Sequence, residues 1–194
     1  MTEPARRFDH IEGRRGGDRV VHVIQGEFAT SADPDVVFST LLGSCVAACL
    51  HDPIARVGGM NHFLLPEGSQ AKSGAVSYGV NAMELLINDM LARGARRDRL
   101  IAKLFGGASM LTGVTDIGAR NIAFIEKFLD TEKIDCPARS LGGLAARRVQ
   151  FWPASGRARQ LLLPDQGRQV FAEETKAAKK PAAAPVDDGA VELF

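Results

Sequence analysis

The sequence predicts an α+β or layered α/β protein, built from many short strands and two helices. Short runs of β-branched and apolar residues, separated by turns that contain glycine, proline or aspartate, indicate strands along most of the chain. Two longer segments carry apolar residues at helical spacing. Many strands combined with two substantial helices favour layers of sheet and helix.

The strands are expected in three groups along the chain. The first is a strand, or a pair of short strands broken at Gly26, over residues 20–30. Extended segments follow at 36–38, 45–51 and 56–64. The last group lies in the second half of the chain, at 99–105, 134–140, 147–152 and 157–163.

The clearer of the two helices is predicted over residues 76–93. An apolar stripe marks it, and Gly94 is a suitable C′ residue to end it. The stripe consists of Val80, Met83, Ile87 and Met90, widened by Leu86 and Leu91. A second helix is expected to begin near Thr115 or Asp116, either of which could cap it, and to run to about Asp130.

Length and composition fit one folded domain with tails. Of the 194 residues, 45% are apolar and 24% charged, which is ordinary for a globular protein. A compact part of about 150 residues buries roughly 70% of its unfolded surface, enough for its own core. We expect residues 1–18 to be a mobile extension, 19–171 the folded domain, and 172–194 a disordered tail rich in Ala, Lys and Pro.

Charge and hydropathy exclude several classes of protein and of binding partner. A net charge of +1 gives no electrostatic case for nucleic acid or a membrane surface as partner. No apolar run approaches the roughly 20 residues that span a bilayer, and the N-terminus lacks the apolar region of a secretory signal. Three cysteines without a framework spacing predict a reducing, cytoplasmic location.

The segment 41–66 has the sequence LLGSCVAACLHDPIARVGGMNHFLLP and can bring a thiol and an imidazole together. Cys45 follows a tight Gly-Ser pair, and His62 ends the neighbouring predicted strand. A cysteine becomes a useful nucleophile as a thiolate, which a nearby base can generate. Backbone N–H groups at Ser44 and Cys45 could face a developing oxyanion. A hydroxyl upstream, on Ser39 or Thr40, could orient the imidazole.

Two other interpretations of these residues stay open at this level. A cysteine in an apolar run is commonly a small buried hydrophobe, and packing is favoured for Cys49 and Cys136. The second interpretation is a metal site. Its candidate ligands are Cys45, Cys49, His51 and His62, although their spacing is not a strong zinc pattern.

The chain resembles a known protein family in several separate blocks of sequence. LGSCVAACLHDP and VGGMNHFLLP, with LFGGASML at 104–111 and IGARN at 117–121, look like the bacterial chemoreceptor glutamine deamidases, CheD, over roughly residues 20–165. The resemblance implies Cys45 as nucleophile and His62 as general base. The family's third residue is a threonine six residues before the cysteine, which corresponds to Ser39 here, with Thr40 adjacent. It also implies a layered α/β sandwich with mixed β-sheets, similar to the fold of the cytotoxic necrotizing factor-type cysteine deamidases.

The activity implied by the resemblance is hydrolysis of glutamine side chains to glutamate in methyl-accepting chemotaxis receptors. No metal and no organic cofactor is expected. The implied partners are the receptor's cytoplasmic helical bundle and a CheC-type phosphatase. The alternative is a non-catalytic module that regulates such a phosphatase or the receptor.

The blocks GGASM and IGARN have two interpretations. They could shape the substrate groove, with Arg120 or Asn121 contacting the receptor. Otherwise their glycines close tight turns, and Asn121 faces solvent at the start of a helix.

Overall fold

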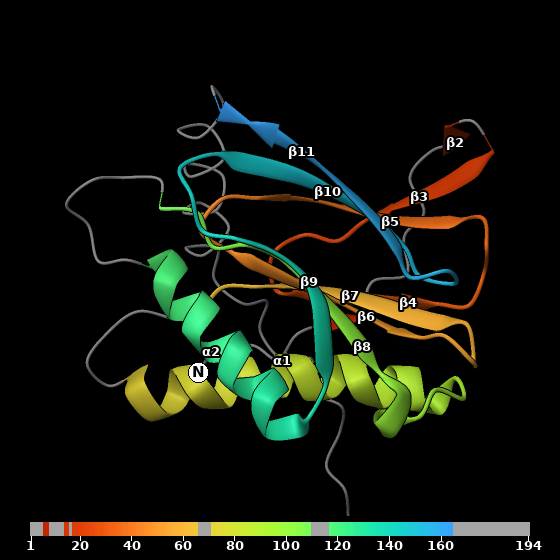
Figure 1. Ribbon diagram of the computed structural model, residues 1–194, viewed down its shortest axis with the longest axis horizontal. Helices are drawn as coiled ribbons and strands as arrows, with labels where there is room; N and C mark the ends of the chain where they lie inside the picture. Colours follow the sequence, from red (N-terminus) through yellow and green to blue (C-terminus); the bar gives the residue numbers. More distant parts are fainter. Residues whose placement is uncertain (1–5, 8–13, 16, 66–70, 110–116, 165–194) are drawn as a thin grey trace, which may run out of the picture.

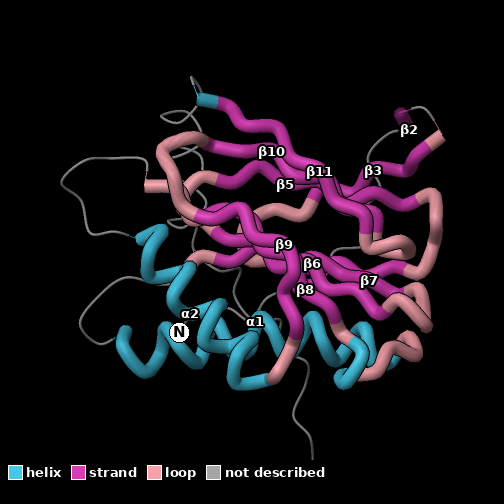
Figure 2. Tube along the Cα trace, in the orientation of Figure 1, coloured by secondary structure: helices cyan, strands magenta, loops and turns pink. Residues whose placement is uncertain are grey.

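The computed structural model describes residues 6–7, 14–15, 17–65, 71–109 and 117–164. Within these residues two β-sheets and two α-helices form three layers (Figure 1). Both helices lie on one side of the strands, against the six-stranded sheet, and the five-stranded sheet covers the opposite face (Figure 2). The predicted α+β class with layered, mixed sheets is confirmed.

The six-stranded sheet carries the segment of interest at its centre. Its order is β1 (Arg6–Arg7), β4 (Glu27–Ser31), β7 (Val57–Phe63), β6 (Val46–Asp52), β8 (Ile101–Gly106) and β9 (Asp135–Leu141). The pairs β1–β4 and β8–β9 are parallel and the others antiparallel. The hairpin β6–β7 therefore occupies the two central positions, which protects it from solvent at both edges.

The five-stranded sheet has the order β11 (Arg157–Leu163), β10 (Ala146–Trp152), β5 (Val36–Leu42), β3 (Asp18–His22) and β2 (Arg14–Arg15). Only β3–β5 is parallel among these pairs. The strands match the sequence predictions within a few residues, except that β5 continues to Leu42. Two short stretches of the expected N-terminal extension, β1 and β2, thus pair with strands of the domain. The tail 172–194 lies outside the described residues.

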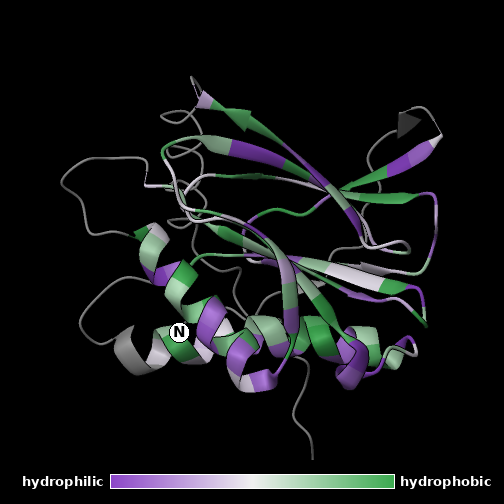
Figure 3. Ribbon diagram, viewed as in Figure 1, coloured by the Kyte–Doolittle hydropathy of each residue, from purple (hydrophilic) through white to green (hydrophobic). Residues whose placement is uncertain are grey.

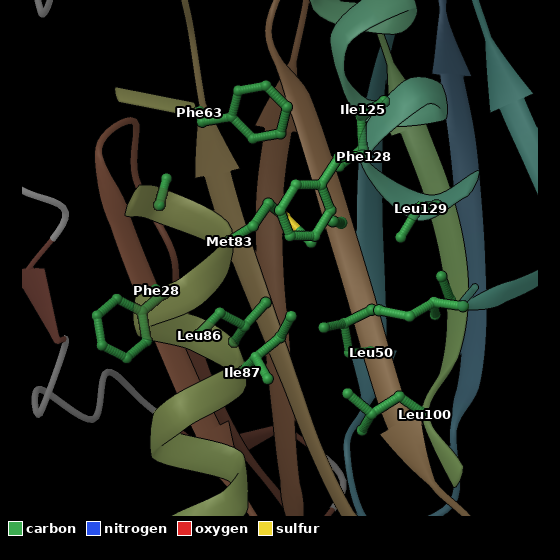
Figure 4. Close-up of a cluster of buried hydrophobic side chains, with 14 of the residues drawn as sticks. Phe28, Leu50, Phe63, Met83, Leu86, Ile87, Leu100, Ile125, Phe128 and Leu129 are labelled. Atoms are coloured by element: carbon green, nitrogen blue, oxygen red, sulfur yellow. The ribbon is translucent and has the colours of Figure 1, made fainter. Parts of the chain in front are cut away.

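The two faces of β6 belong to two different cores. Val46, Ala48 and Leu50 face the helices, whereas Cys45, Ala47 and Cys49 face the second sheet, as the two-residue period of a strand requires. Figure 4 shows the helix-side core, in which each fully buried side chain contributes about 1.5–3 kcal/mol. Its members include Phe28, Leu50, Phe63, Met83, Leu86, Ile87, Leu100, Ile125, Phe128 and Leu129.

Helix α1 (Ala71–Ala92) confirms most of the predicted stripe. Met83, Ile87, Met90 and Leu86 are fully buried, but Val80 is 37% exposed. The buried face of α1 is centred on Gly79 instead of Val80. A Cβ at Gly79 would lie 2.5 Å from Cζ of Phe124 in α2 (Ile117–Glu132). The absence of a side chain at Gly79 lets the helices approach, and this turns Val80 to the edge.

Both helices mix hydrophobic and hydrophilic residues along their length, as helices with one buried face do (Figure 3). Gly94 ends α1 with a φ of 94°, which confirms its predicted role, and a short 3₁₀ turn, Arg97–Arg99, leads into β8. The expected caps of α2, Thr115 and Asp116, lie outside the described residues. Among the described helices, none is long and apolar enough to cross a membrane.

Candidate active site

Cys45 lies in the turn between β5 and β6 and is completely buried. The loop after β8 holds this turn: the N–H of Gly107 donates to the Cys45 carbonyl at 2.7 Å, and the N–H of Ala108 donates to the Gly43 carbonyl at 2.8 Å. A side chain at Gly106, whose φ is 114°, would overlap the Cys45 carbonyl oxygen. The glycines of the GGASM block are therefore needed for this close approach.

Asn121, in the first turns of α2, connects the two strands that carry the thiol and the imidazole. Its Nδ2 donates to the Ser44 carbonyl at 2.9 Å, and its Oδ1 accepts from the Leu65 N–H at 2.9 Å. The side chain is fully buried. The expectation that Asn121 faces solvent is therefore wrong, and contact of Arg120 or Asn121 with a receptor stays a prediction. Asn121 ties the turn before Cys45 to the chain just after His62.

The strand register makes Cys45 and His62 neighbours. Ala47 of β6 lies opposite His62 of β7. Cys45 precedes Ala47 by one pleat on the same face, so it is the diagonal neighbour of His62, within reach of a long side chain. The structure therefore brings together the two residues that the sequence singled out.

A hydroxyl and a backbone carbonyl orient the His62 ring. Thr40 Oγ1 lies 2.9 Å from His62 Nδ1 and 2.7 Å from the Val23 carbonyl oxygen. Since a carbonyl only accepts, the single Thr40 hydrogen goes to Val23, and Oγ1 accepts from Nδ1–H. The same Val23 oxygen is 3.3 Å from Nδ1. The proton thus resides on Nδ1, and Nε2 is the basic nitrogen.

The hydroxyl beside the His62 imidazole belongs to Thr40, which the sequence offered as the alternative to Ser39. The geometry does not support the first choice, Ser39, as the orienting residue. Neighbouring residues of a strand point to opposite faces. Phe38 and Leu42 of β5 belong to the core between the sheets, and Thr40 shares their face. Ser39 is buried on the other face of β5, away from His62.

Sequence reasoning missed a further residue at the thiol. Cys45 Sγ donates a hydrogen bond to Gln25 Oε1 at 3.5 Å, and Gln25 is partly exposed. Burial raises the pKa of the Tyr78 hydroxyl in α1, and the charge of Cys45 raises it further. Gln25 lies in a loop without periodicity, so no pattern could have indicated it.

The structure does not gather the four residues considered as metal ligands. Nδ1 of His51 lies 2.9 Å from the Pro153 carbonyl oxygen, and burial lowers the pKa of this histidine. Cys49 is completely buried in the apolar core between the sheets, where it packs as a hydrophobe, and burial raises the pKa of its thiol far above the usual range. Within the described part of the chain, no group of three or more His, Cys, Asp or Glu side chains could hold a metal ion.

The family model and the curated relatives that match this chain carry the same family name. Residues 64–160 match the family model described as CheD chemotactic sensory transduction. The chain is 55% identical over 181 residues to the "Probable chemoreceptor glutamine deamidase CheD" of Acidiphilium cryptum (strain JF-5), covering 91% of this chain and 94% of the relative. It is 54% identical over 176 residues to the protein of that name from Caulobacter sp. (strain K31), covering 90% and 92%.

Among solved structures, a Neisseria meningitidis protein of the DUF152 family model has a TM-score of 0.40 at 10% identity, covering 64% of this chain and 62% of that one. The family therefore rests on sequence. The matched region of the family model fills half of the chain, and the relatives extend the match over the segment that carries Cys45 and His62. The chain belongs to the CheD family.

Proposed function

We propose that this protein hydrolyses glutamine side chains to glutamate in the cytoplasmic helical bundle of methyl-accepting chemotaxis receptors, with Cys45 as nucleophile. The observation that carries the proposal is the chain of hydrogen bonds from Val23 through Thr40 to His62, which fixes a basic nitrogen on the strand beside Cys45. The names of the relatives, chemoreceptor glutamine deamidases, support the substrate class.

His62 and Cys45 perform the acid–base and nucleophilic steps. Nε2 of His62 takes the thiol proton, and the thiolate attacks the carboxamide carbon of the substrate. The tetrahedral intermediate collapses when the imidazolium protonates the departing ammonia. Water, activated by the same nitrogen, then hydrolyses the thioester to glutamate. Thr40 acts through His62: it accepts from Nδ1–H and thereby stabilises the imidazolium and its orientation. No metal or organic cofactor enters these steps.

The backbone at Ser44 and Cys45 supplies the oxyanion donors in this proposal. In a trans peptide the N–H points opposite to the carbonyl of the same unit. The Gly43 carbonyl is held by Ala108, and the Ser44 carbonyl by Asn121. The N–H groups of Ser44 and Cys45 therefore have fixed directions, away from these anchors. Fixed donors stabilise developing charge without reorganisation.

Mass spectrometry of receptor fragments tests the proposal. Incubation with the wild-type protein should convert specific glutamines to glutamate, a gain of about 1 Da per site, and Cys45→Ala should abolish the conversion. The matched control is Cys49→Ala, which removes a second buried thiol from the same strand face and should retain activity. Equal conversion by wild type and Cys45→Ala would remove Cys45 from the mechanism.

The partners and the limits of the domain are part of the proposal. We assign the deamidase activity to residues 19–171, so a chain truncated at Ala172 should convert receptor glutamines at the wild-type rate. A CheC-type phosphatase is the second proposed partner, and a pull-down with purified phosphatase tests it. Binding that survives in Cys45→Ala would separate a regulatory role from catalysis.

A further inference from the structure

The loop between β3 and β4 is anchored to the proposed site on both sides of Gln25. Before Gln25, the Val23 carbonyl accepts from Thr40 Oγ1 at 2.7 Å. After it, the Gly26 N–H donates to the His62 carbonyl at 2.7 Å. The backbone at Gln25 is thus fixed relative to two members of the site, and its side chain has a defined reach.

That side chain reaches the thiol. Gln25 Oε1 accepts from Cys45 Sγ at 3.5 Å. Cys45 is 0% exposed, so a receptor glutamine can reach the sulfur only after some group beside it has moved. Gln25 is a partly exposed side chain that contacts the sulfur, and it can leave by rotation of its own dihedral angles. Its terminal group is a carboxamide, the group that the proposed reaction hydrolyses.

We propose that the Gln25 carboxamide occupies, in the resting protein, the position beside Cys45 Sγ that the substrate's carboxamide must take, and that the substrate displaces it. The inference rests on the proposed function for the identity of the displacing group. Gln25 is then an internal mimic of the substrate that covers the nucleophile until a receptor glutamine replaces it.

The polarity of the contact explains why the resting arrangement is unproductive. The thiol donates its hydrogen to the amide oxygen, and a thiolate has no hydrogen to donate. Contact with Gln25 Oε1 therefore favours the protonated form of Cys45. The Gln25 oxygen, and not its carbon, faces the sulfur. When the substrate takes this place, the contact ends and His62 can withdraw the proton.

Alkylation of Cys45 tests the inference without requiring deamidase activity. The full-length protein is treated with iodoacetamide at neutral pH, and adduct formation on the Cys45 peptide is followed by mass spectrometry. Gln25→Ala should be alkylated about five- to tenfold faster than wild type, because both the cover and the hydrogen bond are removed. Gln25→Met keeps the bulk without the amide and should give a smaller acceleration.

The neighbouring Ile24 provides the matched control. It is 59% exposed on the same loop, so Ile24→Ala should leave the alkylation rate unchanged. Equal rates in Gln25→Ala and wild type would overturn the inference, and so would an equal acceleration in Ile24→Ala, which would indicate general loosening of the loop. Circular dichroism of each variant confirms folding.

Steady-state kinetics on a receptor fragment give a second, separable readout. Gln25→Ala should lower KM several-fold with kcat within about twofold, because the substrate no longer competes with the internal amide. A raised KM would mean that Gln25 binds the substrate and would overturn the inference. Faster alkylation without any Cys45-dependent deamidation would instead contradict the proposed function alone.

Discussion

The two ends of the β6–β7 hairpin carry similar polar residues in different surroundings. At one end, His62 lies beside Cys45, and its Nδ1 contacts a threonine hydroxyl. At the other end, His51 is followed by Asp52, and its Nδ1 contacts the Pro153 carbonyl. Both histidines use Nδ1, and both are at least partly buried. The residues do not by themselves distinguish a reactive end from a structural one.

What differs is the way each end is closed. The carboxylate of Asp52 is fully buried and bound by Arg99 at 2.7 Å, which forms a fixed ion pair. At the Cys45 end the sulfur faces a side chain that can rotate, Gln25, and the imidazole has a second nitrogen directed by Thr40. A fixed set of partners stabilises the fold, whereas a site for chemistry requires a group that can exchange its partner.

The largest expected effect separates the two histidines. His62→Ala should lower kcat for receptor deamidation by about 10³-fold or more, because no base remains for the thiol. His51→Gln keeps a polar side chain against Pro153 and should change kcat by less than about threefold. Initial rates of ammonia release measure both variants. Comparable losses in the two would contradict the assignment of the reactive end.

The next effect compares two buried asparagines. Asn121→Ala releases both the Ser44 carbonyl and the Leu65 N–H, and we expect kcat to fall about 10- to 100-fold. Asn61 is buried on the helix side of β7, where it accepts from the Ala48 N–H.

Asn61→Ala should destabilise the fold by about 1–3 kcal/mol, with a smaller effect on kcat than Asn121→Ala. Thermal denaturation and kcat are measured on both variants. If the losses in kcat of Asn121→Ala and Asn61→Ala are proportional to their losses in thermal stability, Asn121 has no positioning role.

A smaller effect tests the hydroxyl beside the imidazole. Thr40→Val should lower kcat about tenfold and shift the acidic limb of the pH–rate profile to lower pH, because the imidazolium of His62 loses the Nδ1–H acceptor that stabilises it. Ser39→Ala, on the opposite face of β5, should cost less than about twofold. If Ser39→Ala gives the larger loss, the choice of Thr40 is wrong.

The smallest expected effect on catalysis belongs to Asp52. Burial would raise its pKa, but hydrogen bonds from the Ala55 N–H, the Arg99 side chain and the N–H groups of Arg96 and Ile54 lower it to about 2. A carboxylate whose pKa is lower in the folded than in the unfolded protein stabilises the fold at pH values above its unfolded pKa of about 4. This stability is lost as the pH falls toward 2.

The ionised carboxylate of Asp52 should contribute at most about 2 kcal/mol to the free energy of unfolding, because its partner Arg99 is partly exposed to solvent. Urea denaturation between pH 2 and pH 6 should show that Asp52→Asn is less stable than wild type near neutrality, and that the difference shrinks in acid. A constant difference across this range would show that the ionised carboxylate is not the source. Activity at pH 7 should be unchanged.

Periodicity and turn residues predicted most of the architecture. The apolar runs in 45–51 and 56–64 predicted the neighbouring strands now seen as β6 and β7, and helical spacing predicted α1. These signals are local, because a strand or a helix imposes its period on residues close in sequence. Val80 departs from its predicted place because the partner at Gly79, Phe124, comes from a distant helix.

The candidate nucleophile and base, Cys45 and His62, were also named from the sequence, because they lie on neighbouring predicted strands and match the pair of the deamidase family. What only the tertiary structure decided is how they are held. Whether Ser39 or Thr40 faces His62 depends on which face of β5 packs against the other sheet, and a one-residue difference reverses it. Asn121 reaches Ser44 across 77 residues, a contact that no local period contains. The sequence by itself determined the elements, because they follow from short-range patterns, and its resemblance to the deamidase family named the candidate pair. The packing of two sheets and a helix decided the orienting hydroxyl, the Asn121 anchor and the glutamine over the thiol, because each depends on elements far apart in the chain.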